Sequence, residues 1–110
     1  MQVKITARHV NLSDRFKVHA QEMIERTLSC FPRIEMIHVI MDKQKLLQMA
    51  EINVQGANKI RIDAKAQEET KYLAFDSALA KVEIQLRKQR DRVQEHHTNH
   101  VGLGESEATE

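Results

Sequence analysis

Two hydrophobic periodicities alternate along this chain, and their order constrains its fold more than any other feature. Apolar residues recur at every second position around 3–7, 37–41, 50–54 and 60–66, as in strands that bury one face. They recur every three or four positions over 13–30 and again from Thr70 to Val93, as in amphipathic helices. This order predicts the arrangement β-α-β-β-β-α.

Capping residues mark the ends of the two expected helices. Ser13 is a good N-cap for the first helix, and Pro32 makes continuation of that helix costly. Thr70 is a suitable cap for the second helix. The apolar stripe of the first helix comprises Phe16, Ala20, Ile24, Thr27 and Phe31, and that of the second comprises Tyr72, Phe75, Leu79, Val82, Leu86 and Val93. Each helix therefore has one face to bury.

Short polar turns separate the last three strands. Residues 42–45 (Asp42 to Lys45) are expected to form a hairpin tip, and Gly56, Ala57 and Asn58 supply residues that tolerate positive φ in a turn. These strands should pair antiparallel in chain order, and the first two strands should pair in parallel through a right-handed crossover. The predicted fold class is α+β, a four-stranded sheet with both helices packed on one face.

Composition excludes several classes of protein. A chain of 110 residues with 41% hydrophobic and 30% charged residues fits one globular domain. Cys30 is the single cysteine, no apolar run reaches the ~20 residues of a membrane helix, and residues 1–4 do not resemble a secretory leader. We therefore expect a cytoplasmic protein. With three glycines, at 56, 102 and 104, a glycine-rich loop that cradles phosphates is not expected.

Charge is distributed unevenly along the chain. All 17 lysines and arginines lie at or before Arg92, whereas residues 94–110 contain four glutamates and no basic residue. We expect a basic domain over 1–96 and an acidic, disordered tail over 97–110.

The strongest candidate for chemistry is a basic ridge on the second helix, formed by Lys81, Gln85, Lys88 and Arg92, which share one face and include no acid. Such a ridge suits phosphate neutralisation, although a charged helix face is as often only a solvated surface. Glu83 and Asp91 each lie four residues from Arg87 and should compete for it. Further basic candidates are Arg90, then Lys4, Arg8, Lys59, Arg61 and Lys65 on the polar side of the strands, with Lys43 and Lys45 at the hairpin tip.

Other constellations are weaker. Phe16, Phe31, Tyr72 and Phe75 all fall on core stripes, so an aromatic platform for base stacking is not expected, and binding should use phosphates and the shape of folded RNA. A metal site is conceivable at three neighbouring histidines, His96, His97 and His100, but the sequence offers no obvious further ligands for it. Cys30 has no evident histidine partner for nucleophilic catalysis.

Over residues 2–96 the chain resembles the short ribosome hibernation-promoting factors and ribosome-associated translation inhibitors of bacteria. The most specific segments are Val3-Lys-Ile-Thr-Ala-Arg-His-Val10, Phe31-Pro-Arg-Ile34, and Tyr72-Leu-Ala-Phe-Asp76 followed by the run from Lys81 to Arg92. Asp76, Lys81, Gln85, Leu86 and Lys88 coincide with the helix pattern of that family. The chain departs from it at Ile84, where many relatives have arginine, and in a first helix that is not rich in lysine.

The resemblance implies a β-α-β-β-β-α protein that binds 16S ribosomal RNA in the tRNA and mRNA channel of the small ribosomal subunit and blocks translation in stationary phase or stress. It implies neither enzymatic activity nor a cofactor or small-molecule substrate, and no membrane. It also implies a monomer when free, because the dimerising C-terminal domain of long members is not expected here. Two alternatives remain: a protein-interaction module that pairs through an exposed strand edge, and a small metalloenzyme built on His96, His97 and His100.

Overall fold

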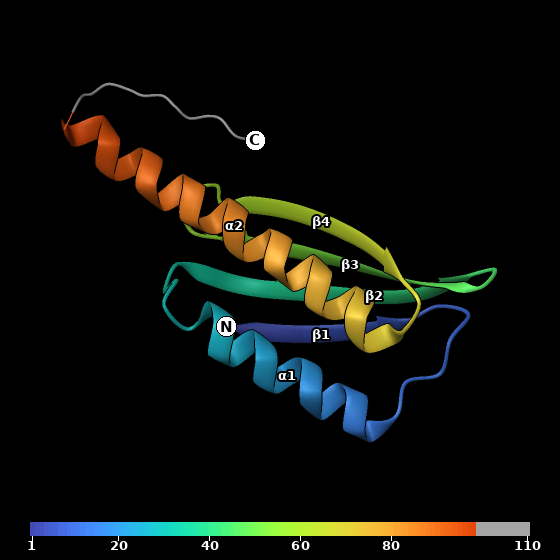
Figure 1. Cartoon of the computed structure of the whole chain (residues 1–110). Coiled ribbons are helices and arrows are strands. Elements are labelled where there is room, and N and C mark those ends of the chain that lie inside the picture. The colour runs from blue at the N-terminus through green and yellow to red at the C-terminus, as the bar shows by residue number, and fades with distance from the viewer. Residues whose placement is uncertain (99–110) are drawn as a thin grey trace.

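A computed structural model of the chain describes the backbone of residues 1–98 and the side chains of residues 1–90. The elements follow one another as β1 (Gln2–Ala7), α1 (Asp14–Leu28), β2 (Ile34–Gln44), β3 (Leu47–Gly56), β4 (Arg61–Glu68) and α2 (Lys71–Thr98) (Figure 1). The predicted order of elements is confirmed. Helix α2 reaches Thr98, and the remainder of the expected acidic tail, 99–110, lies outside the described residues.

The sheet contains the four strands in chain order, β1-β2-β3-β4. β1 pairs parallel with β2, whereas β2 with β3 and β3 with β4 pair antiparallel, as the sequence predicts. β1 and β4 are therefore the two edges of the sheet. Both helices lie on the same side of it (Figure 1), which leaves the other face open.

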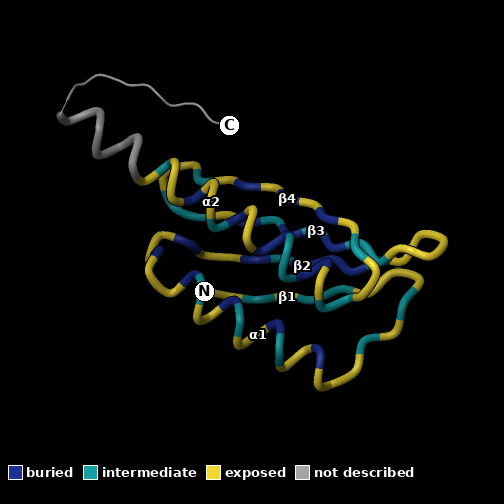
Figure 2. Tube along the Cα trace, in the orientation of Figure 1, coloured by how far each residue is buried: buried dark blue, intermediate teal, exposed yellow. Residues whose placement is uncertain are grey.

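The core lies between the helices and the covered face of the sheet (Figure 2). Phe16, Phe31 and Phe75 are buried in it, and Tyr72 packs against it half-buried. The expected aromatic residues are therefore taken up by the core. In α1, Leu28 rather than Thr27 completes the buried stripe, because Leu28 continues the spacing of four residues set by Phe16, Ala20 and Ile24.

Both expected helix caps are present. The Ser13 Oγ accepts a hydrogen bond from the backbone N–H of Phe16 at 3.1 Å, and the Thr70 Oγ1 accepts one from the N–H of Leu73 at 3.1 Å. Each hydroxyl satisfies a backbone donor that has no partner within the helix. These caps fix the starts of α1 and α2.

The hairpin between β2 and β3 is tighter than the sequence predicts. Asp42, Lys43 and Gln44 belong to β2, and Gln44 pairs with Leu47, so the tip consists of Lys45 and Leu46. Lys45 takes the positive φ of 58° that the turn requires. The expectation of a tip over 42–45 was wrong because polar side chains do not prevent backbone pairing, and the ladder continues through them.

Gly56 has a different role from the one expected. Positive φ in the turn between β3 and β4 is taken by Asn58 at 59° and Lys59 at 64°. A Cβ added to Gly56 would lie 2.3 Å from the carbonyl oxygen of Arg33. The glycine is therefore required for the close approach of two backbones rather than for left-handed backbone geometry.

Neither helix within residues 1–98 is both long and apolar enough to cross a membrane.

Candidate nucleic-acid interface

The basic ridge lies on an exposed side of α2. Lys81, Gln85 and Lys88 are all exposed, whereas Val82 and Leu86 between them are buried against the sheet. The side chain of Arg92, the fourth member, lies outside the described residues. The division of α2 into a buried stripe and an exposed basic side is thus confirmed as far as Lys88.

Lys81 ties the basic ridge to the edge of the sheet. Its Nζ donates a hydrogen bond to the backbone carbonyl oxygen of Lys65 in β4 at 2.7 Å. An ammonium group has three donors, so the contact leaves capacity for a further acceptor such as a phosphate oxygen. The contact places the backbone of Lys65 beside α2, whereas strand alternation directs its side chain to the open face of the sheet.

Arg87 and Arg90, which the sequence analysis places after Lys81, Lys88 and Arg92 as phosphate contacts, have partners within the protein. Arg87 Nη2 lies 2.6 Å from Glu83 Oε2, which confirms the expected pair four residues apart; Asp91, the second expected competitor, has no described side chain. The guanidinium of Arg90 lies 5.2 Å from the centre of the Phe31 ring, within cation–π range. Arg90 therefore helps to fix α2 against the segment that joins α1 to β2.

The basic residues of the sheet do not form one row. Lys4 lies in β1 and Arg8 just after it, at one edge, whereas Arg61 and Lys65 lie in β4 at the other edge. Three strand spacings, roughly 14 Å, separate the two edge strands. Lys59 is in the turn between β3 and β4. The structure thus places the backbone of Lys65 against Lys81, whereas Lys4 and Arg8 lie at the opposite edge of the sheet.

Two histidine–aspartate contacts join separate elements. His9, just after β1, places its Nδ1 3.0 Å from Oδ1 of Asp42 in β2. His19 in α1 places its Nε2 3.2 Å from Oδ1 of Asp76 in α2. The hydrogen bond with His9 and a second from the backbone N–H of Lys43 lower the pKa of Asp42. The first contact therefore ties the end of β1 to β2 within the sheet, and the second ties α1 to α2 within the helical layer.

The metal and nucleophile hypotheses gain no support from the described side chains. Among residues 1–90, no group of three His, Cys, Asp or Glu side chains is arranged to hold a metal ion. His96, His97 and His100 have no described side chains. Cys30 is exposed at the end of α1, with its Sγ 4.0 Å from the carbonyl oxygen of Thr27.

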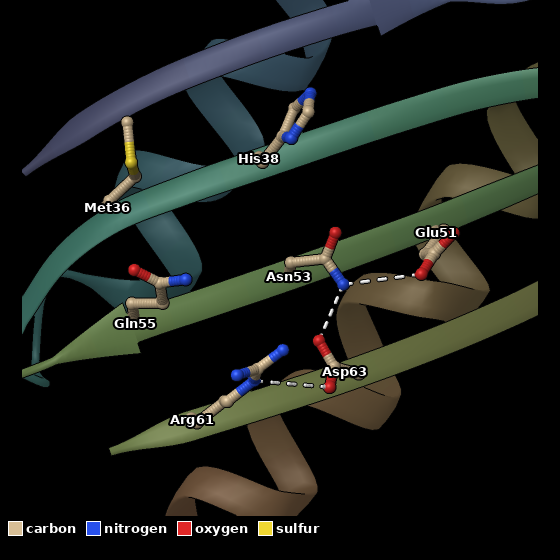
Figure 3. A pocket seen from close by; sticks show the side chains of 7 residues that line it. All are labelled: Met36, His38, Glu51, Asn53, Gln55, Arg61 and Asp63. Carbon is tan, nitrogen blue, oxygen red and sulfur yellow. Dashed lines mark hydrogen bonds and ion pairs between the residues drawn. The ribbon is translucent and has the colours of Figure 1, made fainter. Parts of the chain in front are cut away.

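A polar hollow on the open face of the sheet was missed by sequence reasoning. It has a volume of about 430 Å³ and is lined by Met36, His38, Glu51, Asn53, Gln55, Arg61 and Asp63 (Figure 3). All seven lie at the strand positions that alternate with the buried residues, and this alternation is the only sequence signal for the hollow. Their grouping depends on the register between strands, which alternation alone does not fix.

Comparisons with known proteins point in one direction. A protein-family model described as Sigma 54 modulation protein / S30EA ribosomal protein matches residues 3–94. The ribosome hibernation promoting factor of Pseudomonas putida is 32% identical over 94 residues, which cover 86% of this chain and 91% of that protein. The factor of the same name from Azotobacter vinelandii is 33% identical over 94 residues, covering 84% of this chain and 85% of that one.

Solved structures agree with the sequence matches. A ribosomal subunit interface protein from Coxiella burnetii superposes with a TM-score of 0.77 and 26% identity, covering 83% of this chain and 99% of that chain. The N-terminal domain of Protein Y from Thermus thermophilus shares the fold, with a TM-score of 0.71 at 20% identity, over 80% of this chain and 98% of that domain.

Proposed function

Since this chain belongs to the family of Sigma 54 modulation protein / S30EA ribosomal proteins, we propose that it binds the small ribosomal subunit and inhibits translation. The proposed site is the channel that tRNA and mRNA otherwise occupy, and the proposed contacts are to 16S ribosomal RNA. The protein acts in the cytoplasm during stationary phase or stress, as a binding factor rather than an enzyme. It requires neither a cofactor nor a small-molecule substrate.

The observation that carries this proposal is the basic ridge of α2. Lys81 and Lys88 are exposed on a side of the helix that contains no acid up to residue 90, and the hydrogen bond of Lys81 to the Lys65 carbonyl oxygen sets this side against the β4 edge. Each lysine that neutralises a phosphate releases condensed counterions, so binding weakens steeply as salt rises. The primary contacts are Lys81, Lys88 and Arg92; Arg87 and Arg90 follow, and Lys4, Arg8, Lys59, Arg61 and Lys65 come last.

Pairing through an exposed strand edge is the alternative. At the β4 edge, the carbonyl oxygen of Lys65 already accepts a hydrogen bond from Lys81, and charged side chains protect edges against such pairing. That leaves the edge at β1 as the candidate for a protein partner. Edge pairing depends on backbone hydrogen bonds and should respond little to salt, whereas phosphate contacts should respond strongly.

The experiment is a sedimentation titration of small ribosomal subunits at several potassium concentrations. A variant with Lys81, Lys88 and Arg92 replaced by glutamate should lose binding, and the corresponding alanine variant should lower the salt slope by about 2 to 3 units. The matched control reverses three basic residues of α1, Arg15, Lys17 and Arg26, which changes net charge equally and should retain most of the affinity.

Circular dichroism shows whether each variant is folded. A folded triple variant with wild-type affinity and an unchanged salt slope would show that the basic ridge is only a solvated surface. The channel itself is tested by order of addition: subunits already loaded with mRNA and tRNA should resist the factor. Equal binding to empty and loaded subunits would move the site elsewhere on the particle.

A further inference from the structure

The open face of the sheet presents an ordered polar surface that the proposed α2 interface does not use. Strand register aligns its side chains in three rows across the sheet. The rows are Gln2–Met36–Gln55–Arg61, Lys4–His38–Asn53–Asp63 and Thr6–Ile40–Glu51–Lys65. The hollow described above lies over the β2, β3 and β4 members of these rows other than Ile40 and Lys65 (Figure 3).

Asn53 organises two carboxylates at the centre of the hollow. Its Nδ2 donates to Asp63 Oδ1 at 2.6 Å and to Glu51 Oε2 at 3.3 Å. Figure 3 shows its amide oxygen pointing away from both carboxylates. The Nε of Arg61 lies 3.8 Å from Asp63 Oδ2, so a guanidinium and a carboxylate stand side by side at the β4 end.

His38 brings a flat ring to the same face. Its Nε2 lies 2.8 Å from the Oγ1 of Thr6 on the neighbouring strand, which holds the ring in place. Imidazole rings and guanidinium planes both stack on nucleobases. Although the phenyl rings are in the core, this face thus retains a fixed stacking partner, with the side chain of Met36 beside it.

The arrangement selects for one kind of base edge. Arg61 offers donors next to the acceptor oxygens of Asp63, so the matching ligand presents an acceptor next to donors. Every RNA base places an acceptor next to a donor, but guanine alone adds a second donor: its N1–H and 2-amino group can both donate to the carboxylate of Asp63 while O6 accepts from Arg61. The carboxylates of Asp63 and Glu51 repel phosphate, while Lys4 and Lys65 at the two edges attract it.

We propose that the open face of the sheet binds a single unpaired guanine of RNA, with Asp63 and Arg61 reading its Watson–Crick edge and His38 stacking on the base. This inference rests on the proposed RNA partner but uses a face separate from the basic ridge of α2. The base contact adds sequence selectivity to a phosphate-based attachment, and it contributes little to salt dependence.

The test is an NMR titration of the full chain, labelled with nitrogen-15, with three RNA pentamers that differ only in the central base. 5′-UUGUU should bind about tenfold more tightly than 5′-UUAUU. The version with inosine, which lacks the 2-amino group, should fall between them. The side-chain signals of Asn53 and Arg61 should shift with the guanine pentamer.

Asp63→Asn should abolish the guanine preference, measured as the ratio of the affinities for 5′-UUGUU and 5′-UUAUU, because a general change of charge alters both affinities alike. Glu69→Gln, an exposed residue between β4 and α2, is the matched control: it removes the same charge elsewhere and should keep the preference. Because the side chain of Asp63 is half exposed, the variant should stay folded, and circular dichroism checks this.

Equal affinity for the three pentamers overturns the guanine site, while the α2 interface stands or falls on the small-subunit titration. Perturbation of Asn53 and Arg61 by an arginine-rich peptide, with no response to the guanine pentamer, also overturns it and assigns the face to a basic protein segment. A guanine preference that Asp63→Asn removes supports the site even if the α2 triple variant binds subunits normally.

Discussion

The ammonium group of Lys81 in α2 lies 2.7 Å from the backbone carbonyl oxygen of Lys65 in β4 and donates a hydrogen bond to it. This hydrogen bond therefore fixes the position of the basic ridge relative to the sheet edge before any ligand binds. Pre-organisation of this kind reduces the entropy that binding must remove. It also raises the question of whether Lys81 still acts on phosphate.

Lys81→Gln should lower the salt slope of small-subunit binding by about one unit, because the ammonium group keeps two donors for phosphate oxygen. The free energy of unfolding should change by less than about 1 kcal/mol, since water can reach the exposed carbonyl. Sedimentation at several potassium concentrations and urea unfolding measure the two quantities. An unchanged slope would mean that Lys65 fully occupies Lys81.

Glu83→Gln should strengthen RNA binding. The present contact of 2.6 Å holds Arg87 against a carboxylate, and the substitution weakens that contact while removing one negative charge from α2. The salt slope should rise as Arg87 becomes available to phosphate. Arg87→Ala should have a smaller effect in the wild-type background than in the Glu83→Gln background, where no carboxylate holds the arginine. If Glu83→Gln weakens binding, the pair itself positions the interface.

Ile84→Arg should tighten binding, because residue 84 is 54% exposed and lies one turn before Lys88. An arginine here extends the cationic surface without entering the core, and it should add about 0.7 to 0.9 to the salt slope. Filter binding of RNA measures both effects. Ile84→Gln, equally polar but uncharged, is the control and should leave the slope unchanged.

Asp42→Asn should reduce stability at neutral pH but have little effect in acid. The folded state lowers the pKa of Asp42 through its hydrogen bonds with His9 and Lys43. Below the ordinary aspartate value of about 3.9, the unfolded chain binds more protons, so the contribution is lost as pH falls through the lower folded pKa. Urea unfolding at pH 7 and at pH 2.5 should show the difference between variant and wild type shrinking. A difference that is constant with pH would contradict this origin.

A stop codon after His100 should leave the melting temperature within a few degrees of the wild-type value, because residues 101–110 offer no apolar stripe. It also removes Glu105, Glu107 and Glu110, so non-specific RNA binding at low salt should tighten. Calorimetry measures the melting temperature, and filter binding measures the affinity for RNA. A large drop in melting temperature would mean that this segment packs on the domain.

The elements were predictable because each depends on local periodicity, and the direction of strand pairing followed from their order through general rules of connection. Alternation in β2 or the four-residue spacing in α1 is visible without any knowledge of neighbours. The caps at Ser13 and Thr70 were likewise local, since the hydroxyl and the N–H that it accepts from are three residues apart.

Features that join distant segments were not predictable. The contact of Arg90 with Phe31 depends on how α2 crosses the layer, and the close approach of Gly56 to Arg33 depends on a local irregularity in register. The polar hollow was missed for the same reason: His38, Asn53 and Asp63 are 10 or more residues apart and meet only through strand pairing. Sequence reasoning also treated the basic residues of the sheet as one group, although they occupy two edges.

The parallel pairing of β1 has a consequence for the order of folding. Gln2 pairs with Met36 across the whole of α1, whereas β2, β3 and β4 are joined by short turns. Closing the longer loop costs more chain entropy, so we expect the three-stranded meander to form from near neighbours and β1 to join it later. In the native state, we expect β1 to open before the meander, because it is an edge strand paired with β2 alone. Such an opening leaves β4, α2 and the bond between Lys65 and Lys81 in place, so the cationic side of the molecule persists while its N-terminal strand is released.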